Sequence, residues 1–221
     1  MLDPEVLNLI AKTVADRVTG ELRKEIDELK AEVRARGDEI CTLRDKVDEL
    51  EQYGRRNSVR ISSIPETSGE DTDAMVQTVA RAVGVDLPPA AIDRSHRVGP
   101  QGTQPRPILV KLTSYRHKLA LMKARAGLRN ADSKKLFPSL KWPAPPQSSQ
   151  PLSQSSHVPF ATRIFINEDL TKPRAELAKK ARGLKKANKT TDTWTRDGVI
   201  FIKRGTNVSK ITTPREIQVF E

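Results

Sequence analysis

A heptad repeat near the start of the chain constrains its fold more than any other feature. Apolar side chains recur at alternating steps of four and three residues, which places them in one stripe along an α-helix. The residues of this stripe, called the seam below, are Leu22, Ile26, Leu29, Val33, Ile40, Leu43, Val47 and Leu50. Four heptads exceed what a single amphipathic helix on a globular core needs. The seam therefore predicts a self-associating parallel coiled coil over residues 5–54, rather than a lone solvated helix.

The number of strands in this coiled coil stays open on the heptads alone. Isoleucine or valine at the first seam position of each heptad, with leucine at the second, favours a two-stranded coil. Residues 46–51, in contrast, resemble a motif associated with trimers, in which Arg usually stands at the place of Lys46. Arg36 replaces an apolar seam residue, so Arg36 and Gly37 form the weakest point of the repeat.

Charge separates this N-terminal segment from the rest of the chain. The 221 residues include 39 Lys and Arg against 28 Asp and Glu, a formal net charge of +11. Residues 1–54 carry a net charge of −5, whereas residues 55–221 carry +16. Such an excess of positive charge favours polyanions, of which nucleic acid is the commonest. A merely basic solvated surface is the alternative.

The middle of the chain alternates between predicted strands and helices. The expected elements are a strand over 58–64, a helix over 71–84, strands over 92–98 and 107–113, a helix over 115–128 and a strand over 164–169. This order is typical of a split βαβ-βαβ domain of the ferredoxin-like or RNA-recognition-motif type. We expect an α+β chain with this domain over 57–130, completed by its final strand within 162–170.

The stretch between the second helix and the final strand has a different composition. Residues 131–161 contain six prolines and seven serines and few apolar side chains. Such a composition buries too little apolar surface to offset the loss of chain entropy on ordering. The sequence therefore predicts a disordered insert over 131–161.

The last segment, 171–221, predicts a small domain made of a helix and a β-hairpin. The helix spans 171–187, with an apolar stripe and, on the opposite side, a basic stripe. The hairpin spans 193–203, and Asp197-Gly198 forms its two-residue turn. This register places Trp194 opposite Phe201, on the same side as Arg196. The two rings either form a stacking platform for unpaired bases or pack on the helix.

Six motifs follow one another along the chain, at residues 50–61, 64–66, 96–99, 106–115, 164–171 and 194–198. Together, and in this order, they resemble the first-open-reading-frame protein of LINE-type non-LTR retrotransposons. The resemblance implies a homotrimer, an RNA-recognition-motif domain and a C-terminal domain that together bind single-stranded RNA and act as a nucleic-acid chaperone. It also implies cytoplasmic ribonucleoprotein particles, with the nucleus as an alternative location. This sequence departs from the family's pattern in two ways. Its third strand lacks base-stacking aromatic residues, and it has a long insert at a place where the family has a short connection.

The basic residues and one aromatic residue of these segments form the predicted nucleic-acid interface. Its members are Arg55, Arg56, Arg60, Arg97, Lys111, Arg116, Lys179, Arg182, Lys186, Lys189, Trp194 and Arg196. Arg55, Arg56, Arg60, Arg97, Lys111, Trp194 and Arg196 are placed there by the resemblance. Strand alternation independently places Arg60 and Lys111 on the open face of the sheet, if the core-facing residues are Val59, Ile61, Ile108, Val110 and Leu112. Without aromatic residues on its third strand, binding should depend on phosphates and select weakly among sequences.

Other classes of function have less support in the sequence. The lone Cys41 and three scattered histidines give no metal-ligand pattern, and no phosphate-cradling glycine loop or nucleophile-base spacing is present. The adjacent Glu168 and Asp169 are more simply a strand-end and helix-entry pair than a catalytic pair. We therefore expect no enzyme, no metal and no cofactor. No apolar run reaches the ~18 residues of a membrane span, so we expect no membrane association. A coiled-coil adaptor that binds an acidic protein is the alternative to a protein that binds single-stranded RNA or DNA.

Overall fold

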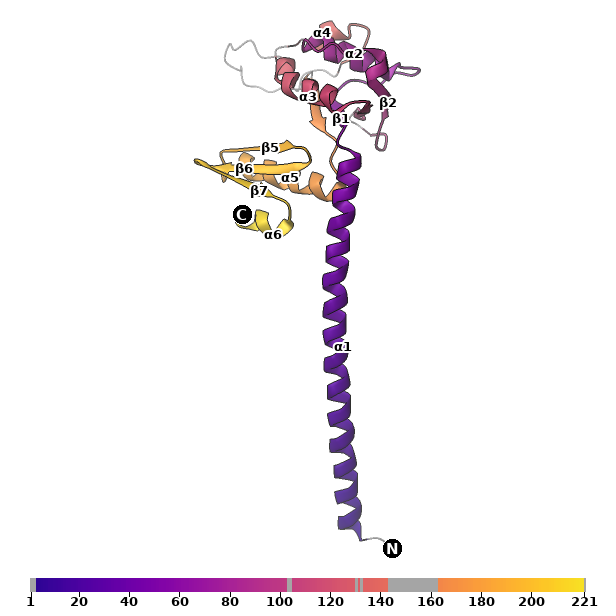
Figure 1. The fold of residues 1–221 in the computed structure, drawn as a ribbon, viewed down its shortest axis with the longest axis vertical. Helices are drawn as coiled ribbons and strands as arrows, with labels where there is room; N and C mark the ends of the chain where they lie inside the picture. Colours follow the sequence, from indigo (N-terminus) through magenta and orange to yellow (C-terminus); the bar gives the residue numbers. More distant parts are fainter. Residues whose placement is uncertain (1–2, 103–104, 130, 132, 143–162, 221) are drawn as a thin grey trace. The chain divides into compact units, whose positions relative to one another are not determined.

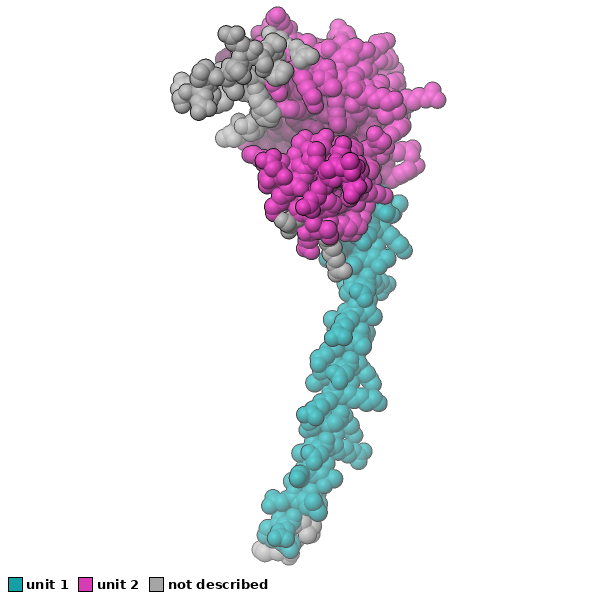
Figure 2. Space-filling model, turned by 90° about the vertical axis from the view of Figure 1, so that its left-hand side faces the viewer, with its two compact units in different colours: residues 1–50 teal, residues 51–221 magenta. Residues whose placement is uncertain are grey.

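A computed structural model describes residues 3–102, 105–129, 131, 133–142 and 163–220 of the chain. The chain divides into two compact units, residues 1–50 and residues 51–221, which Figure 2 colours separately. Within the described residues, no helix combines the length and hydropathy that crossing a membrane would require.

Nearly all of the first unit is one long helix, α1, which spans Pro4–Gly54 and continues into the start of the second unit (Figure 1). The helix is uninterrupted at Gly37, next to the predicted weak point of the seam. Arg36, which breaks the seam, forms an ion pair with Glu32 one turn before it. Each of the eight seam residues is 48–73% exposed in the single chain. The single chain therefore has the long helix and the apolar stripe that the heptads predicted, with the stripe exposed.

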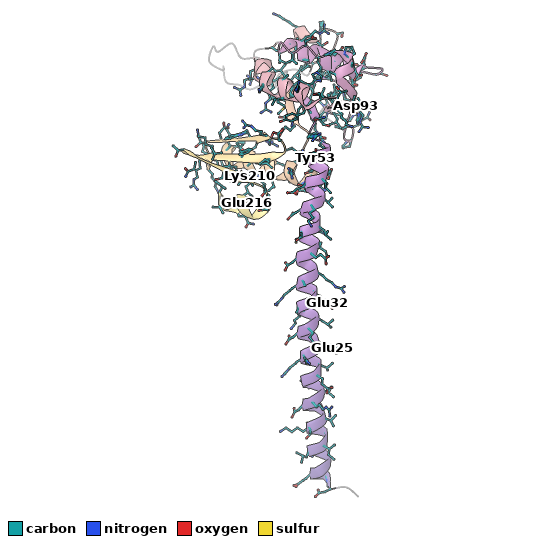
Figure 3. All side chains as sticks on the ribbon, in the orientation of Figure 1. Glu25, Glu32, Tyr53, Asp93, Lys210 and Glu216 are labelled. Carbon is teal, nitrogen blue, oxygen red and sulfur yellow. The ribbon has the colours of Figure 1, made fainter. Side chains whose placement is uncertain are left out.

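The residues between the seam positions of α1 are mostly charged. Glu25 and Glu32, both labelled in Figure 3, are one heptad apart, and each directly precedes a seam residue. Ion pairs one turn apart, such as Arg17 with Glu21 and Lys24 with Glu28, support the helix itself. These exposed pairs contribute only a few tenths of a kcal/mol each.

The second unit begins with a four-stranded antiparallel sheet whose strand order is β2-β3-β1-β4. Its elements are β1 (Ser58–Ser62), α2 (Thr72–Ala82), η1 (Pro89–Ala91), β2 (Ile92–Arg97), β3 (Ile108–Leu112), α3 (Tyr115–Ala124), η2 (Arg125–Arg129), α4 (Ser133–Leu136) and β4 (Phe165–Glu168). The predicted order of strands and helices is confirmed. We call residues 57–170 of this unit the sheet lobe.

One face of the sheet carries the core. The predicted inward residues are all buried, namely Val59, Ile61, Ile108, Val110 and Leu112. Helices α2 and α3 contribute to the same apolar cluster. Strand alternation therefore turns the residues between them toward the opposite face, which we call the open face.

The buried stripe of α2 is not the one that a regular spacing of four residues marks in the sequence. That spacing marks Met75, Val79 and Val83, but the fully buried residues are Val76, Val79 and Ala80. Met75 and Val83 are only partly buried. A helix has 3.6 residues per turn, so a stripe stays on one side of it only when its residues are spaced alternately by three and by four positions. A spacing of four each time drifts around the helix.

The first part of the predicted disordered insert is folded. Phe137 and Ser133 are buried, and Leu136, Leu140 and Trp142 pack against the core of the sheet lobe. The indole Nε1 of Trp142 donates to the Phe137 carbonyl at 3.2 Å. The expectation of disorder is therefore wrong for residues 133–142. The expectation of disorder rested on the average composition of residues 131–161, but the apolar residues of this range are concentrated near its start. The rest of the range, 143–161, lies outside the described residues.

The C-terminal lobe, residues 171–220, contains one long helix under a three-stranded sheet. Its elements are α5 (Lys172–Lys186), β5 (Asp192–Arg196), β6 (Val199–Arg204), β7 (Asn207–Ile211) and α6 (Pro214–Gln218), and the strand order is β5-β6-β7. Helix α5 buries Leu177, Ala181 and Leu184 against Ile200 and Ile202. The apolar stripe predicted for this helix is confirmed.

The hairpin of β5 and β6 has the predicted register. Trp194 pairs with Phe201, and Thr195 pairs with Ile200. Asp197 and Gly198 both have positive φ, 53° and 77°, as a type I′ turn requires. Because the isoleucines face α5, the aromatic pair lies on the other side of the ribbon. Its ring centroids are 5.6 Å apart and its planes 9° apart. The alternative that these rings pack on the helix is therefore wrong.

Strand β7 and helix α6 were not predicted. Helix α6 begins with a capping box, in which the Thr213 side chain accepts from the Glu216 amide and the Glu216 carboxylate accepts from the Thr213 amide. The amide of Thr212 also donates to that carboxylate and, with the Thr213 amide, lowers the pKa of Glu216. The sequence Thr-Pro-Arg-Glu carries the signature of such a box, so this helix could have been found.

Candidate nucleic-acid interface

The open face of the sheet carries the two cations predicted there. The Arg60 side chain is 38% exposed, and its Nε lies 2.6 Å from Oδ1 of Asp169. The Lys111 Nζ lies 3.2 Å from Oδ2 of Asp93, and both of these side chains are about half exposed. An ion pair this open is weak and solvent-screened, so Lys111 keeps much of its capacity to attract an anion.

The basic junction after α1 splits into one engaged and one open arginine. Arg55 lies 3.2 Å from both carboxylate oxygens of Asp169 and also pairs with Glu51. Arg56 is exposed, and its guanidinium stacks 4.2 Å from the ring centroid of Tyr53 (labelled in Figure 3). Of the two, Arg56 is better placed to meet a phosphate from solvent.

Arg97 is buried, in contrast to its predicted place in the interface. Its side chain is 5% exposed. It donates to both carboxylate oxygens of Glu70 and to the carbonyls of Ile64, Pro65 and Arg106. These bonds use all five donors of a guanidinium. Arg97 therefore ties the loops at this end of the sheet together, and we remove it from the interface.

A cavity of about 320 Å³ is bordered by both lobes of the second unit. Its lining comes from η2, β4, α5 and β5. Four arginines and two aromatic residues contribute to it, namely Arg125, Arg129, Arg163, Arg182, Phe165 and Trp194. No aspartate or glutamate is among the residues that line it in the described part of the chain. The cavity is therefore positively charged and has aromatic surface in its wall.

A second cavity, of about 500 Å³, adjoins the first. The two share Arg125, Trp194 and Thr195 in their walls. The second also has Lys123 and Arg196 in its lining, both of them exposed. We call the two cavities together the groove. The carboxylates in the wall of the second cavity, Glu168 and Asp197, are both engaged by Lys118, as described below.

Among the residues that the structure describes, Trp194 is one of the three that line both cavities. Its ring is stacked on that of Phe201. An aromatic residue at the border of a basic groove offers a surface on which an unpaired base can stack.

The basic stripe of α5 is exposed as predicted, but only part of it meets the groove. Lys179, Arg182 and Lys186 are exposed and form no ion pair with any residue that the structure describes. Arg182 lines the first cavity, whereas Lys179 and Lys186 do not. Lys189, also exposed, has an interaction within the chain. The stripe extends the positive surface beyond the groove.

Arg116 and Lys185 lie outside the groove lining as well. Arg116 is exposed in the first turn of α3, where its amide donates to the Ser114 hydroxyl. Lys185 pairs with Asp192, and this hydrogen bond, with one from the Thr193 amide, lowers the pKa of Asp192. Lys185 is therefore partly neutralised.

A buried polar network lies beside the groove. Lys118 is 4% exposed, and its Nζ lies 2.8 Å from Glu168 and 3.2 Å from Asp197. Burial by itself would lower the pKa of Lys118, but the hydrogen bonds and charges of these two carboxylates raise it. The Tyr115 hydroxyl donates to Asp197 at 2.8 Å, which raises the pKa of that phenol. Lys118 thus stays charged.

Glu168 and Asp169 therefore have structural partners. Sequence reasoning interpreted them as a strand-end and helix-entry pair rather than as a catalytic pair. Glu168 accepts from the amides of Asp197 and Gly198, and Asp169 neutralises Arg55 and Arg60. Within the described residues, no group of three His, Cys, Asp or Glu side chains is placed to hold a metal ion.

Sequence reasoning missed three groove arginines and the buried lysine. Arg125 and Arg129 follow α3 at a spacing of four, and Arg163 precedes β4, so a search for basic residues at element ends would have found them. Nothing in the sequence marks Lys118, because its burial depends on residues 50 and 79 positions away. Comparisons with known proteins give no further guide, since no protein-family model and no curated protein matches the chain.

Proposed function

We propose that this chain binds single-stranded nucleic acid, RNA foremost, in the groove between η2, β4, α5 and β5. The observation that carries the proposal is the lining of the first cavity, where the residues that the structure describes include four arginines and two aromatic residues but no carboxylate. Arginine is suited to phosphate because its planar fork offers paired donors and it stays charged at any physiological pH. Aromatic rings accept bases of any identity by stacking.

Several features favour a single strand over a duplex. A duplex keeps its bases stacked on one another, so they cannot reach a ring in the wall of a cavity of about 320 Å³. The strand order and the one-sided helices support an RNA-recognition-motif-like sheet lobe. Its open face carries Leu109 and Lys111 on β3, not aromatic residues. Contacts should therefore fall mainly on phosphates, with weak preference among sequences.

The seam of α1 supports self-association as part of the same function. Eight apolar residues in one stripe, each about half exposed or more, need a partner that covers them. A second copy of the same helix carries a stripe with the same repeat of 3.5 residues, so the stripes of two copies match along their length. Together with the motif resemblance, this supports a parallel homotrimer and membership of the LINE first-open-reading-frame family. The proposed role is that of a ribonucleoprotein component and nucleic-acid chaperone, located in cytoplasmic particles.

The test is the salt dependence of binding. The affinity of the full chain for a fluorescein-labelled, unstructured 20-nucleotide RNA is measured by anisotropy at a series of KCl concentrations. If about five phosphates are contacted, the logarithm of the association constant should fall with the logarithm of salt at a slope near −3.5, at ~0.7 per contact. A blunt duplex of the same length should bind more weakly.

A control variant links this slope to the groove. Replacing Arg129 and Arg182 by alanine should make this negative slope shallower by about 1.4, since each substitution removes one phosphate contact. The double alanine variant of Arg81 and Arg204, two exposed arginines outside the lining, should leave the slope unchanged. Absence of binding in dilute buffer, or a slope near zero, contradicts the proposal. If a pull-down with this chain then still retains an acidic protein after nuclease treatment, the adaptor alternative is favoured.

A further inference from the structure

The tip of the β5-β6 hairpin is held by an unusual number of polar contacts. Glu168 accepts the amides of Asp197 and Gly198 at 2.8 and 3.2 Å, and Lys118 binds the carboxylates of both Glu168 and Asp197. Tyr115 donates to Asp197 from the side. We call these three contact residues, Lys118, Glu168 and Tyr115, the turn socket. All three belong to the sheet lobe, whereas the turn belongs to the C-terminal lobe.

The socket depends on charge balance at a buried place. Lys118 and Glu168 are each 4% exposed. A buried charge is costly unless it is paired and its remaining hydrogen-bonding groups are satisfied. Here Glu168 is satisfied by one ammonium and two amides, and the ammonium is shared with Asp197. Removing Lys118 would leave two neighbouring carboxylates without their common cation.

The turn also fits closely from its other side. A Cβ on Gly198 would lie 2.4 Å from Cγ of Gln52. Arg174 of α5 donates to the Gly198 carbonyl at 3.2 Å. The turn is thus enclosed by α3, β4, α5 and the end of α1, and it cannot shift without losing these contacts.

The seated turn fixes one wall of the groove. Strand β5 ends directly before the turn, and its residues Trp194, Thr195 and Arg196 line the cavities. We propose that Lys118 is a positioning residue for nucleic-acid binding. By seating the Asp197-Gly198 turn, it holds β5 at the distance from β4 and η2 that a single strand needs. This inference rests on the proposed function and adds the residue that sets the geometry of its site.

The test compares Lys118→Met with Lys118→Arg and Lys24→Met. The methionine keeps the length of the stem and removes the ammonium, whereas arginine keeps a cation that can bridge two carboxylates. Lys24 is an exposed lysine of α1 and serves as the matched control. Affinity for the same 20-nucleotide RNA is measured across the salt series, well below the melting temperature that circular dichroism gives for each variant.

The expected result is a loss of affinity without a change of slope. Lys118→Met should bind about tenfold more weakly, because the wall residues are no longer held in place. The slope should stay that of the unmodified chain, because Lys118 itself touches no phosphate. Lys118→Arg should recover most of the affinity, and Lys24→Met should bind as the unmodified chain does. Tyr115→Phe, which removes a single exposed hydrogen bond, should show a smaller loss in the same direction.

A spectroscopic signal separates positioning from general stability. In a Trp142→Phe background, Trp194 is the only tryptophan, and its emission should shift when Lys118→Met frees β5.

Full affinity of a folded Lys118→Met variant for the RNA would overturn the inference. A salt slope that is shallower by ~0.7 would overturn it as well, because Lys118 would then be a direct phosphate contact. If Lys118→Met does not fold, full affinity in Tyr115→Phe with a displaced Trp194 signal overturns it. If the unmodified chain binds no RNA, the proposed function fails instead, and the Trp194 shift still reports on the socket.

Discussion

At the scale of single residues, the environment of each cation decides what it can do. Arg56 and Arg182 are exposed and available, Arg55 and Arg60 share one buried carboxylate, and Arg97 has no donor left. These five arginines look alike in the sequence. A count of basic residues therefore overstates the proposed interface, whereas the arginines that gather around one cavity identify the groove.

Gly198 gives a prediction at this scale. Both Gly198 and Gly205 have positive φ, 77° and 61°, but only Gly198 has close neighbours. Alanine at either position should cost about 1–2 kcal/mol for the left-handed backbone. Gly198→Ala should cost a further 1–3 kcal/mol or so, because its Cβ overlaps Gln52. Gln52 cannot yield easily, since it bonds Asp169 and Thr171.

Urea unfolding at equilibrium measures this difference. Gly205→Ala is the matched control, because no atom lies within 4 Å of the Cβ that it adds. Equal losses of unfolding free energy for the two variants would show that the turn is not tightly enclosed.

At the scale of elements, local patterns predicted most of what the structure contains. The sequence alone predicted the alternation of core-facing and open-face residues in β1 and β3. It also predicted the order of strands and helices in the sheet lobe and the register of the β5-β6 hairpin. Each depends on residues that are neighbours in the chain. Strand β7 was missed because its alternation is weak, with Val208 exposed and only Ile211 buried. Residues 133–142 were misjudged because their burial depends on a core built elsewhere.

The seam supports a prediction at this scale. Replacing Ile26 and Val33 by aspartate places charges in the seam, where a coiled coil cannot solvate them. Multi-angle light scattering should show a mass near that of three chains for the unmodified protein and of one chain for this variant. Aspartates at Ala31 and Ala35, which lie outside the seam, should leave the larger mass unchanged. A single-chain mass for the unmodified protein contradicts the coiled-coil proposal.

At the scale of the whole molecule, charge is segregated along the chain, and the proposed function gives the two parts separate tasks. Residues 1–54 have a net charge of −5 and the remainder +16. An acidic α1 does not compete for RNA, so it can bring several basic units together without binding the ligand itself. Bringing several grooves together raises the effective concentration of each for one long strand.

This division of tasks predicts a length-dependent effect. The monomeric variant with aspartates at 26 and 33 should bind a long single-stranded RNA about 10²–10⁴-fold more weakly than the unmodified chain. An oligonucleotide that is long enough for one groove only should bind both proteins with similar affinity. Titrations of a short and a long labelled RNA measure the ratio. An equal loss for both lengths would mean that the substitutions damage the groove rather than the assembly.

The sequence by itself determined the features that depend on near neighbours, namely the seam, the strand faces, the hairpin turn and the segregation of charge. Tertiary structure alone decided which cations lie in ion pairs and which arginines gather around the cavity. Asp169 reaches Arg60 across 109 positions, and the groove joins η2 and β4 to β5, up to about 70 residues apart in the chain. Ion pairing and cavity formation depend on distance in space, and no periodicity in the chain encodes that distance. A nucleic-acid interface could therefore be expected from the charge, but only the fold brings together the residues that we propose for it.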